Sequence, residues 1–154
     1  MAGLYVKVAT KKQIIMDLKN QTQKRSIKFR AWWENQLRYN AIAGNGQCLF
    51  IPNATGEYKQ INLAECKIMQ STGYEDVRGI EIYEDDIVSM KSYNYHFLNS
   101  HLFRVVYETK DMQFKLLDIE TKNVYSVVGF FDLQIVGNIY EGSELLGRSV
   151  KADA

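Results

Sequence analysis

The first part of the chain changes from one pattern of apolar positions to another. Residues 4–10 (LYVKVAT) alternate apolar and polar side chains, which predicts a short strand. A helix is expected next, because Thr10 can serve as its N-cap and Ile14, Ile15 and Leu18 form a narrow apolar stripe among lysines. A helix this short is marginal on its own, so we expect the stripe to lie against another surface.

From residue 27 onward the chain has the pattern of short strands. The segments IKFRAW, QLRYNAI, QCLFI, EYKQI and CKIMQ are separated by turn-forming runs at 44–46 and 52–56. Glycine and asparagine in these runs accept positive φ, which gives the turns a physical basis. This half is expected to form a small antiparallel sheet.

The second half repeats the strand pattern with short connections. Its five segments are DDIVSM, HLFRVVYE, QFKLLDI, NVYSVVGF and LQIVGNIY. Short, evenly spaced strands with little helix between them indicate a sandwich or barrel. The chain is therefore predicted to be mainly β, with one short N-terminal helix, a closed five-stranded barrel of the SH3 type, and a single 3₁₀ turn at 130–132.

Composition agrees with a globular protein. The chain has 154 residues, of which 46% are hydrophobic, and it has one proline, which argues against disorder and low complexity. Its longest nearly unbroken apolar run, at 124–131, is far shorter than the roughly 20 residues of a membrane-spanning helix. No signal-peptide pattern is seen, so a cytoplasmic protein is expected. Cys48 and Cys66 lack CxxC spacing, and neither a disulfide nor a redox role is expected.

Charge is distributed unevenly. Residues 1–33 contain eight basic residues and one acidic residue, a net +7, so with an overall charge of +1 the remainder carries −6. This asymmetry indicates either a basic arm for an anionic partner or an arm that docks on the acidic body of a neighbouring subunit.

Three blocks of unusual sequence stand out. Residues 27–33 read IKFRAWW, residues 70–88 read QSTGYEDVRGIEIYEDDIV, and residues 135–146 read IVGNIYEGSELL. In this order they resemble the YopX family of bacteriophage and prophage proteins. The resemblance implies an SH3-like barrel in the C-terminal half and a place in the host bacterial cytosol, and it implies no particular activity. The motif residues are Gly73, Gly79, Glu81, Ile82, Tyr83, Glu84, Asp86, Gly137, Asn138, Tyr140 and Glu141.

Four segments are expected along the chain. Residues 1–26 form an N-terminal strand plus a basic helical extension, and residues 27–82 form an N-terminal β portion. Residues 83–146 form the SH3-like barrel domain, and residues 147–154 form a flexible tail.

An acidic cluster is the first candidate site. Glu81, Glu84, Asp85 and Asp86 could supply oxygen ligands to a hard cation, but their spacing is not that of an EF-hand loop. In a strand, Glu84 and Asp86 would share one face and Asp85 the other. The resembling sequences have glycine at the position of Asp85, and aspartate tolerates positive φ. A structural turn is preferred over a partner-facing acidic patch or a metal site.

The loop at residues 91–101 is the second candidate. It contains Tyr93, Tyr95, His96, Phe97 and His101, whose rings could stack on bases or contact a protein or peptide. Packing of these rings onto a small core is the preferred interpretation. The histidine spacing does not match a zinc site.

The first strand of the β region is the third candidate. Lys28, Arg30 and Trp32 share one face, which could face outward like a nucleic-acid groove. The preferred alternative is that Trp32 packs under the sheet edge while the cations are solvated. Trp33 stands where the resembling sequences have Asp or Asn, so exposed apolar surface here could belong to an interface.

Known catalytic motifs are missing: the sequence has no phosphate loop, GxGxxG, HExxH or GxSxG. We predict a non-catalytic protein-interaction module without cofactor or metal, able to self-assemble or to bind another phage or host protein, and not a membrane. The alternative is a DNA- or RNA-binding protein in phage DNA metabolism or regulation. Its phosphate contacts would be Lys11, Lys12, Lys24, Arg25, Lys28 and Arg30, and its stacking residues Trp32, Tyr93 or Tyr95.

Overall fold

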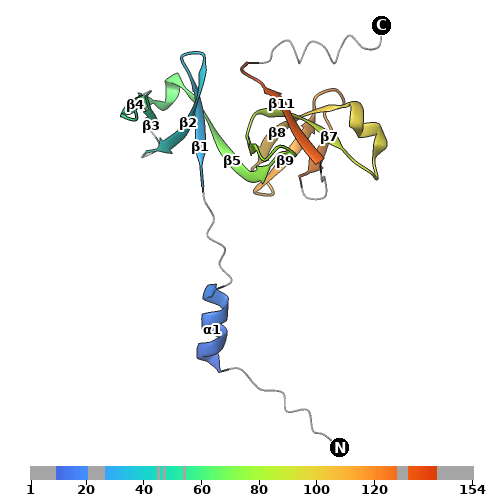
Figure 1. Cartoon of the computed structure of the whole chain (residues 1–154), viewed down its shortest axis with the longest axis horizontal. Helices are drawn as coiled ribbons and strands as arrows, with labels where there is room; N and C mark the ends of the chain where they lie inside the picture. Colours follow the sequence, from blue (N-terminus) through green and yellow to red (C-terminus); the bar gives the residue numbers. More distant parts are fainter. Residues whose placement is uncertain are drawn as a thin grey trace, which may run out of the picture.

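The computed structural model is mainly β. It describes residues 10–20, 27–44, 46, 48–53, 55–127 and 132–141, and the strand predicted at 4–10 lies outside these ranges. Two antiparallel sheets lie side by side, and β5 runs from one toward the other (Figure 1). Nothing helical in these ranges combines the length and apolar character needed to cross a bilayer.

The first sheet contains six strands in the order β4-β3-β2-β1-β5-β6. The strands are β1 (Phe29–Trp33), β2 (Gln36–Ala43), β3 (Cys48–Pro52), β4 (Tyr58–Asn62), β5 (Lys67–Glu75) and β6 (Glu81–Tyr83), with the short 3₁₀ helix η1 (Leu63–Glu65) before β5. The turn between β1 and β2 is formed by Glu34 and Asn35, which both have positive φ (50° and 58°). Two such residues give a turn whose twist matches that of the paired strands. The predicted antiparallel sheet is confirmed.

The second sheet contains five strands in the order β10-β9-β8-β7-β11. The strands are β7 (Asp86–Lys91), β8 (Leu102–Glu108), β9 (Gln113–Asp118), β10 (Val124–Ser126) and β11 (Asp132–Asn138), with the 3₁₀ helix η2 (His96–Ser100) between β7 and β8. All five predicted strands are present. Within the described ranges no closed barrel is found, since β10 and β11 are the outermost strands and do not pair. The 3₁₀ turn expected at 130–132 falls mostly outside these ranges, and Asp132 begins β11.

Each sheet has its own apolar core. The first core contains six buried residues: Ala31, Ala41, Leu49, Ile51, Ile61 and Cys66. The second core contains nine: Ile82, Val88, Met90, Leu98, Phe103, Val105, Leu116, Val127 and Leu133. The two cores are separate clusters, but Ile82 of β6 belongs to the second, so the edge of the first sheet packs against the core of the second sheet.

The predicted N-terminal helix is present as α1 (Lys11–Asn20). Thr10 acts as its cap, because the backbone N–H of Gln13 donates to Thr10 Oγ1 at 3.3 Å. Figure 1 shows α1 standing apart from both sheets, and Ile15 and Met16 are 43% and 50% exposed. Of the predicted stripe, Ile15 is thus exposed, and the side chains of Ile14 and Leu18 lie outside the described residues, so the expectation that the stripe lies against another surface stays a prediction.

Candidate functional site

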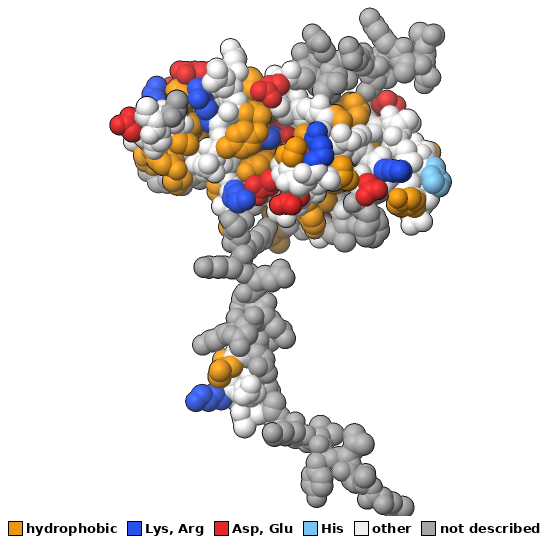
Figure 2. Space-filling view, viewed as in Figure 1, with side chains coloured by type: hydrophobic (Ala, Val, Ile, Leu, Met, Phe, Trp, Pro, Cys, Tyr) orange, Lys and Arg blue, Asp and Glu red, His pale blue; other side chains and the backbone are white. Residues whose placement is uncertain are grey.

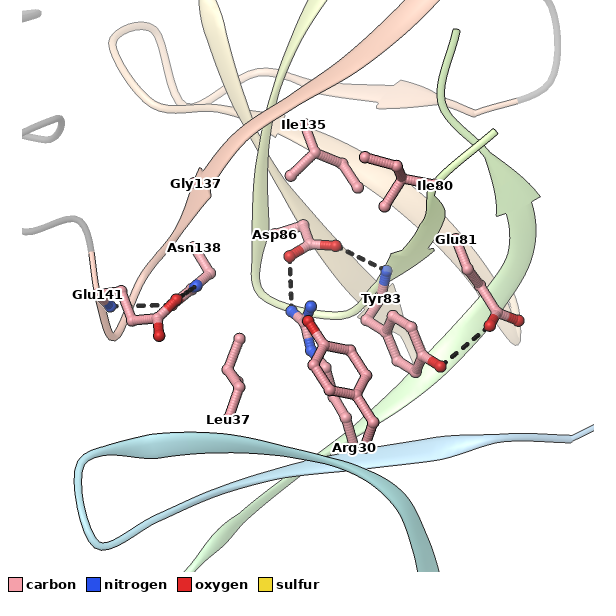
Figure 3. Close-up of a pocket in the computed structure, with 11 residues that line it drawn as sticks. Arg30, Leu37, Ile80, Glu81, Tyr83, Asp86, Ile135, Gly137, Asn138 and Glu141 are labelled. Carbon is pink, nitrogen blue, oxygen red and sulfur yellow. Dashed lines mark hydrogen bonds and ion pairs between the residues drawn. The ribbon is translucent and has the colours of Figure 1, made fainter. Parts of the chain in front are cut away.

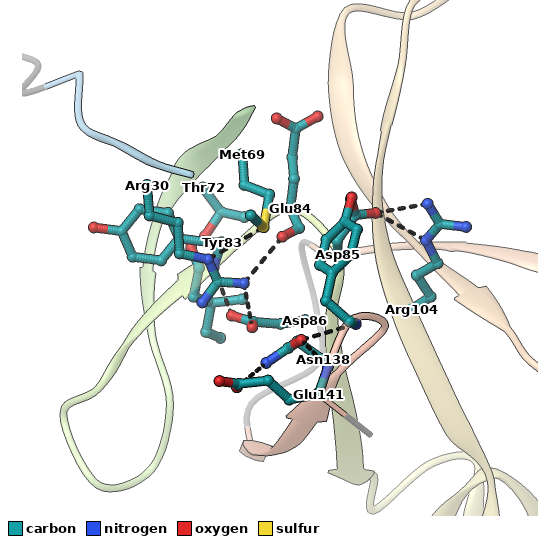
Figure 4. A network of polar contacts seen from close by, with 12 residues as sticks. Arg30, Met69, Thr72, Tyr83, Glu84, Asp85, Asp86, Arg104, Asn138 and Glu141 are labelled. Atoms are coloured by element: carbon teal, nitrogen blue, oxygen red, sulfur yellow. Dashed lines mark hydrogen bonds and ion pairs between the residues drawn. The ribbon is translucent and has the colours of Figure 1, made fainter. Parts of the chain in front are cut away.

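A buried ion pair joins the two sheets. Arg30 on β1 donates from Nη2 to Asp86 Oδ1 at 2.6 Å, and both side chains are almost fully buried. Asp86 begins β7, 56 positions further along the chain. The second carboxylate oxygen, Oδ2, accepts the backbone N–H of Tyr83 at 2.8 Å (Figure 4). Burial raises the pKa of Asp86, and the Arg30 guanidinium and the Tyr83 N–H oppose that effect.

Other groups around Arg30 complete its surroundings. Its Nη2 also donates to the Glu84 carbonyl oxygen at 3.2 Å, and its Nε lies 3.4 Å from Met69 Sδ. The guanidinium carbon lies 4.7 Å from the centre of the Tyr83 ring, a cation–π distance. Charge and ring contacts thus hold Arg30 in place from several sides.

The prediction that Lys28, Arg30 and Trp32 form an outward-facing stripe is wrong for Arg30. Arg30 is neither outward-facing nor solvated, because β1 is an inner strand with one face on the first core and the other against the turn before β7. Lys28 is exposed and pairs with Glu81 at 3.0 Å, at the edge of the same junction. A phosphate could not reach Arg30 without breaking its pairing with Asp86.

The acidic turn before β7 is built around Asp85, which has a φ of 66°. The prediction that this residue occupies a positive-φ turn is confirmed. Its Oδ1 accepts two N–H groups of Arg104, at 2.9 and 2.7 Å, and its Oδ2 accepts the Tyr140 hydroxyl at 2.8 Å. Burial and the Asp85 carboxylate raise the pKa of Tyr140 to about 12. The Tyr140 ring stacks on Trp32 with ring centres 5.5 Å apart, so Trp32 packs against the second sheet's last turn.

A second clamp between the sheets is formed by Asp76, at the end of β5. Its buried carboxylate accepts backbone N–H groups from Arg78, Ile80 and Ile135, at 2.8, 3.0 and 3.2 Å. The Arg78 guanidinium donates to it and also to the carbonyl oxygen of Ile135 in β11. Burial alone would raise the pKa of Asp76, but the Arg78 side chain and the three N–H groups outweigh it and lower the pKa to about 2.

A cleft of about 440 Å³ opens beside the Arg30–Asp86 pair (Figure 3). Residues of the two later sequence blocks line much of it, namely Glu81, Tyr83, Asp86, Gly137, Asn138 and Glu141. The tertiary structure therefore brings the blocks at 70–88 and 135–146 to one place. Leu37 and Tyr39 of β2 complete the wall, and nothing in their sequence context had singled them out.

Cleft charge is predominantly negative. Three carboxylates line it, from Glu81, Asp86 and Glu141, against the single guanidinium of Arg30. Burial would raise the pKa of Glu81, but hydrogen bonds from Ser71, Lys28 and the Tyr83 hydroxyl outweigh this and lower it. Glu141 is exposed and accepts the Asn138 side-chain N–H at 2.6 Å. Asp86 is paired with Arg30 and Glu81 with Lys28, so among the described residues Glu141 is the accessible carboxylate of the cleft that has no cationic partner.

The loop before β8 presents an aromatic surface, hereafter the aromatic tip, made of Tyr93, Tyr95 and Phe97. These side chains are 66%, 53% and 64% exposed, so the expectation that they pack onto the core is wrong. Only Leu98 of η2 enters the core, since one short helical turn can direct only one of these neighbours inward. Asn99 stabilises the loop, because its Oδ1 accepts the Ser92 N–H at 2.7 Å.

The remaining candidate residues are scattered. Lys11, Lys12 and His96 are exposed, while Lys24 and Arg25 lie outside the described residues. Trp33 is half-buried against the first core and is covered by Lys59, whose Nζ lies 4.6 Å from the ring centre, so the expected exposed apolar surface is not present there.

His101 forms a structural pair with a buried aspartate. His101 Nδ1 lies 2.6 Å from Asp118 Oδ2, and Asp118 is fully buried and also accepts backbone N–H groups of Glu120 and Thr121. No group of three or more metal-binding side chains occurs among the residues that the structure describes. Cys66 is a free, buried thiol, and the side chain of Cys48 lies outside the description.

Comparison with known proteins adds a family and a fold. A family model described as YopX protein matches residues 28–147. Among solved structures, the crystal structure of protein EF1440 from Enterococcus faecalis superposes with a TM-score of 0.51 and 24% identity, covering 79% of this chain and 98% of that one. At this identity the likeness concerns the fold alone. No curated protein matches the chain.

Proposed function

This chain belongs to the YopX family, as its three sequence blocks predicted, and from that premise we propose that it is a non-catalytic protein-interaction module. The proposal places it in the cytoplasm of a bacterial host, encoded by a phage or prophage. The observation that supports binding most directly is the aromatic tip.

The aromatic tip has the properties of a contact surface. Tyr95 and Phe97 meet edge to face with ring centres 6.2 Å apart, and Tyr93 is the most exposed of the three side chains. Tyrosine and phenylalanine are enriched in protein interfaces because they bury large area at little cost in side-chain entropy. Because the loop is fixed by Leu98 and Asn99, the rings are held ready for a partner.

A protein partner is favoured over nucleic acid. Phosphate binding needs several accessible cations near the stacking rings. Arg30 is committed to Asp86, and Trp32 is committed to Tyr140, so two of the residues expected in a nucleic-acid groove are occupied. The tip itself has Lys91 nearby and no acidic residue between positions 91 and 101, which keeps single-stranded nucleic acid as the second candidate.

Support for a non-catalytic role comes from the polar groups themselves. The buried carboxylates of Asp76, Asp86 and Asp118 are each held by a cationic side chain or histidine and by backbone N–H groups. Such pairings are what buried structural carboxylates need.

The five-stranded sheet is proposed to be an open form of an SH3-like barrel. Its last strand, β11, returns to pair with its first, β7, while β8, β9 and β10 continue on the other side. In this strand order β10 and β11 lie at opposite edges of the sheet. If the sheet curled further, these two edges would approach each other and could close a barrel.

The test is capture of partners by variants of the tip. Immobilised wild-type protein, the triple variant Tyr93→Ser, Tyr95→Ser, Phe97→Ser, and a control variant Tyr107→Ser, Met112→Ser would be incubated with bacterial host lysate and, separately, with a labelled single-stranded DNA. We expect a specific protein bound by wild type and control and lost from the tip variant. DNA binding that weakens as salt rises and disappears in the tip variant would replace this proposal with the nucleic-acid one.

A further inference from the structure

We propose that helix α1 of one copy of this chain binds in the cleft of a second copy, which makes the protein a homo-oligomer. This interface lies apart from the aromatic tip and goes beyond the proposed function. It joins two surfaces that are exposed in one copy: the side of α1 that carries Lys11, Lys12, Ile15 and Met16, and the cleft beside Arg30 and Asp86.

The helix offers a face that combines cations with apolar side chains. Lys11 and Ile15 are four residues apart, as are Lys12 and Met16, so each pair lies on neighbouring turns of one side. Figure 2 shows hydrophobic and lysine side chains next to one another on the described part of α1. A ten-residue helix with exposed apolar side chains gains little stability alone and is stabilised by packing on a complementary surface.

The cleft offers the complementary combination. Its apolar wall includes Ile80, which is 47% exposed, together with Leu37 and Ile135, and Tyr39 stands 50% exposed at its rim. Figure 3 shows Ile80, Ile135 and Leu37 around the opening, with Glu81 and Glu141 on opposite sides. A surface with an apolar floor and the exposed carboxylate of Glu141 at one end, the other end holding Glu81 paired with Lys28, suits side chains that have an aliphatic stem and a cationic head.

Charge and position both favour a second copy as the occupant. Residues 1–26, ahead of the β region, hold six basic residues and one acidic residue, a net +5, so with an overall charge of +1 the remainder carries −4, and the N-terminal region of one copy is attracted to the body of another. Figure 1 places α1 away from both sheets of its own chain, where it can reach a neighbour. The cleft volume of about 440 Å³ accommodates side chains of a helix laid across its opening.

The experiment exchanges the charges of the two surfaces. Light scattering coupled to size exclusion, over a range of concentrations, would compare wild type with Lys11→Glu, Lys12→Glu, with Glu141→Lys, and with the three substitutions combined. Glutamate in the first turn of a helix is favoured by the helix dipole, so the first variant does not weaken α1 itself. Glu141→Lys removes one hydrogen bond to Asn138, whose Oδ1 still accepts the N–H groups of residues 140 and 141.

We expect wild type to associate, each charge reversal to weaken association at least about tenfold, and the combined variant to recover much of it. A matched control, Lys110→Glu with Glu120→Lys, reverses charges on exposed turns outside the cleft and should associate like wild type. The proposal is overturned by a wild type that stays monomeric at every concentration. It is equally overturned by association that the α1 or Glu141 substitutions leave unchanged, or by no recovery in the combined variant.

Discussion

The cores of the two sheets differ in content, although both sheets are antiparallel and similar in strand number. Among the described residues, the core of the first sheet has six buried members, of which two are alanines and one is a cysteine. The second core has nine, including Phe103, Met90 and Leu98, the last supplied by η2. Since apolar area buried is the main source of stability, the second sheet is expected to be the more stable of the two.

Contact between the sheets combines apolar packing, by Ile82 in the second core and Trp32 on Tyr140, with buried polar pairs. The Arg30–Asp86 pair and the hydrogen bond from the Ile135 N–H to Asp76 connect residues of different sheets or the turns beside them. Polar contacts depend on geometry more steeply than apolar ones, so they fix how the sheets are placed. The smaller core is therefore expected to rely on this junction more than the larger core does.

Breaking the buried ion pair should have the largest effect. Arg30→Met leaves the Asp86 carboxylate buried without its cation, and the expected loss in free energy of unfolding is about 3–5 kcal/mol. Urea denaturation measures the loss, and hydrogen exchange should show the first sheet opening before the second. The double variant Arg30→Met, Asp86→Leu replaces both charges with apolar groups and should be closer to wild type. A single variant as stable as wild type would contradict the role given to the pair.

Matched core truncations test whether the two cores are independent. Leu49 in the first core and Leu116 in the second are both fully buried, so each change to alanine should cost about 2–5 kcal/mol. Leu49→Ala is expected to speed amide exchange mainly in β1 to β5, and Leu116→Ala across both sheets, because the first sheet depends on the junction. Identical exchange patterns for the two variants would show that the molecule unfolds as one unit.

Acid should loosen the Asp76 clamp selectively. The pKa of Asp76 is lowered from 3.8 to about 2, so its contribution to stability is complete above pH 4 and is lost as pH falls toward 2. Asp76→Asn should remove this part of the acid dependence while reducing stability at neutral pH, because the amide cannot pair with Arg78. Thermal denaturation of both proteins across this interval is the measurement. Equal acid sensitivity of wild type and variant would exclude the clamp as its source.

The smallest effect is expected at Tyr140. Tyr140→Phe keeps the ring on Trp32 but removes the hydroxyl that donates to Asp85, which should cost about 0.5–1.5 kcal/mol. Tyr107→Phe, on an exposed side chain, serves as control and should be neutral. If the two substitutions have equal effects in urea denaturation, the Asp85 hydrogen bond adds nothing to the junction.

The sequence by itself determined the local structure. Period-two alternation placed the strands, Thr10 placed the start of α1, and Asp85 marked a turn that requires positive φ, since each of these depends on a few neighbouring residues. The three sequence blocks also identified the family. Only the tertiary structure decided that Arg30 is buried against Asp86, that the later blocks line one cleft with Leu37 and Tyr39, and that the aromatic tip faces solvent. A strand pattern shows which residues share a face, but what covers that face depends on elements distant in sequence, and here the turn before β7 covers Arg30.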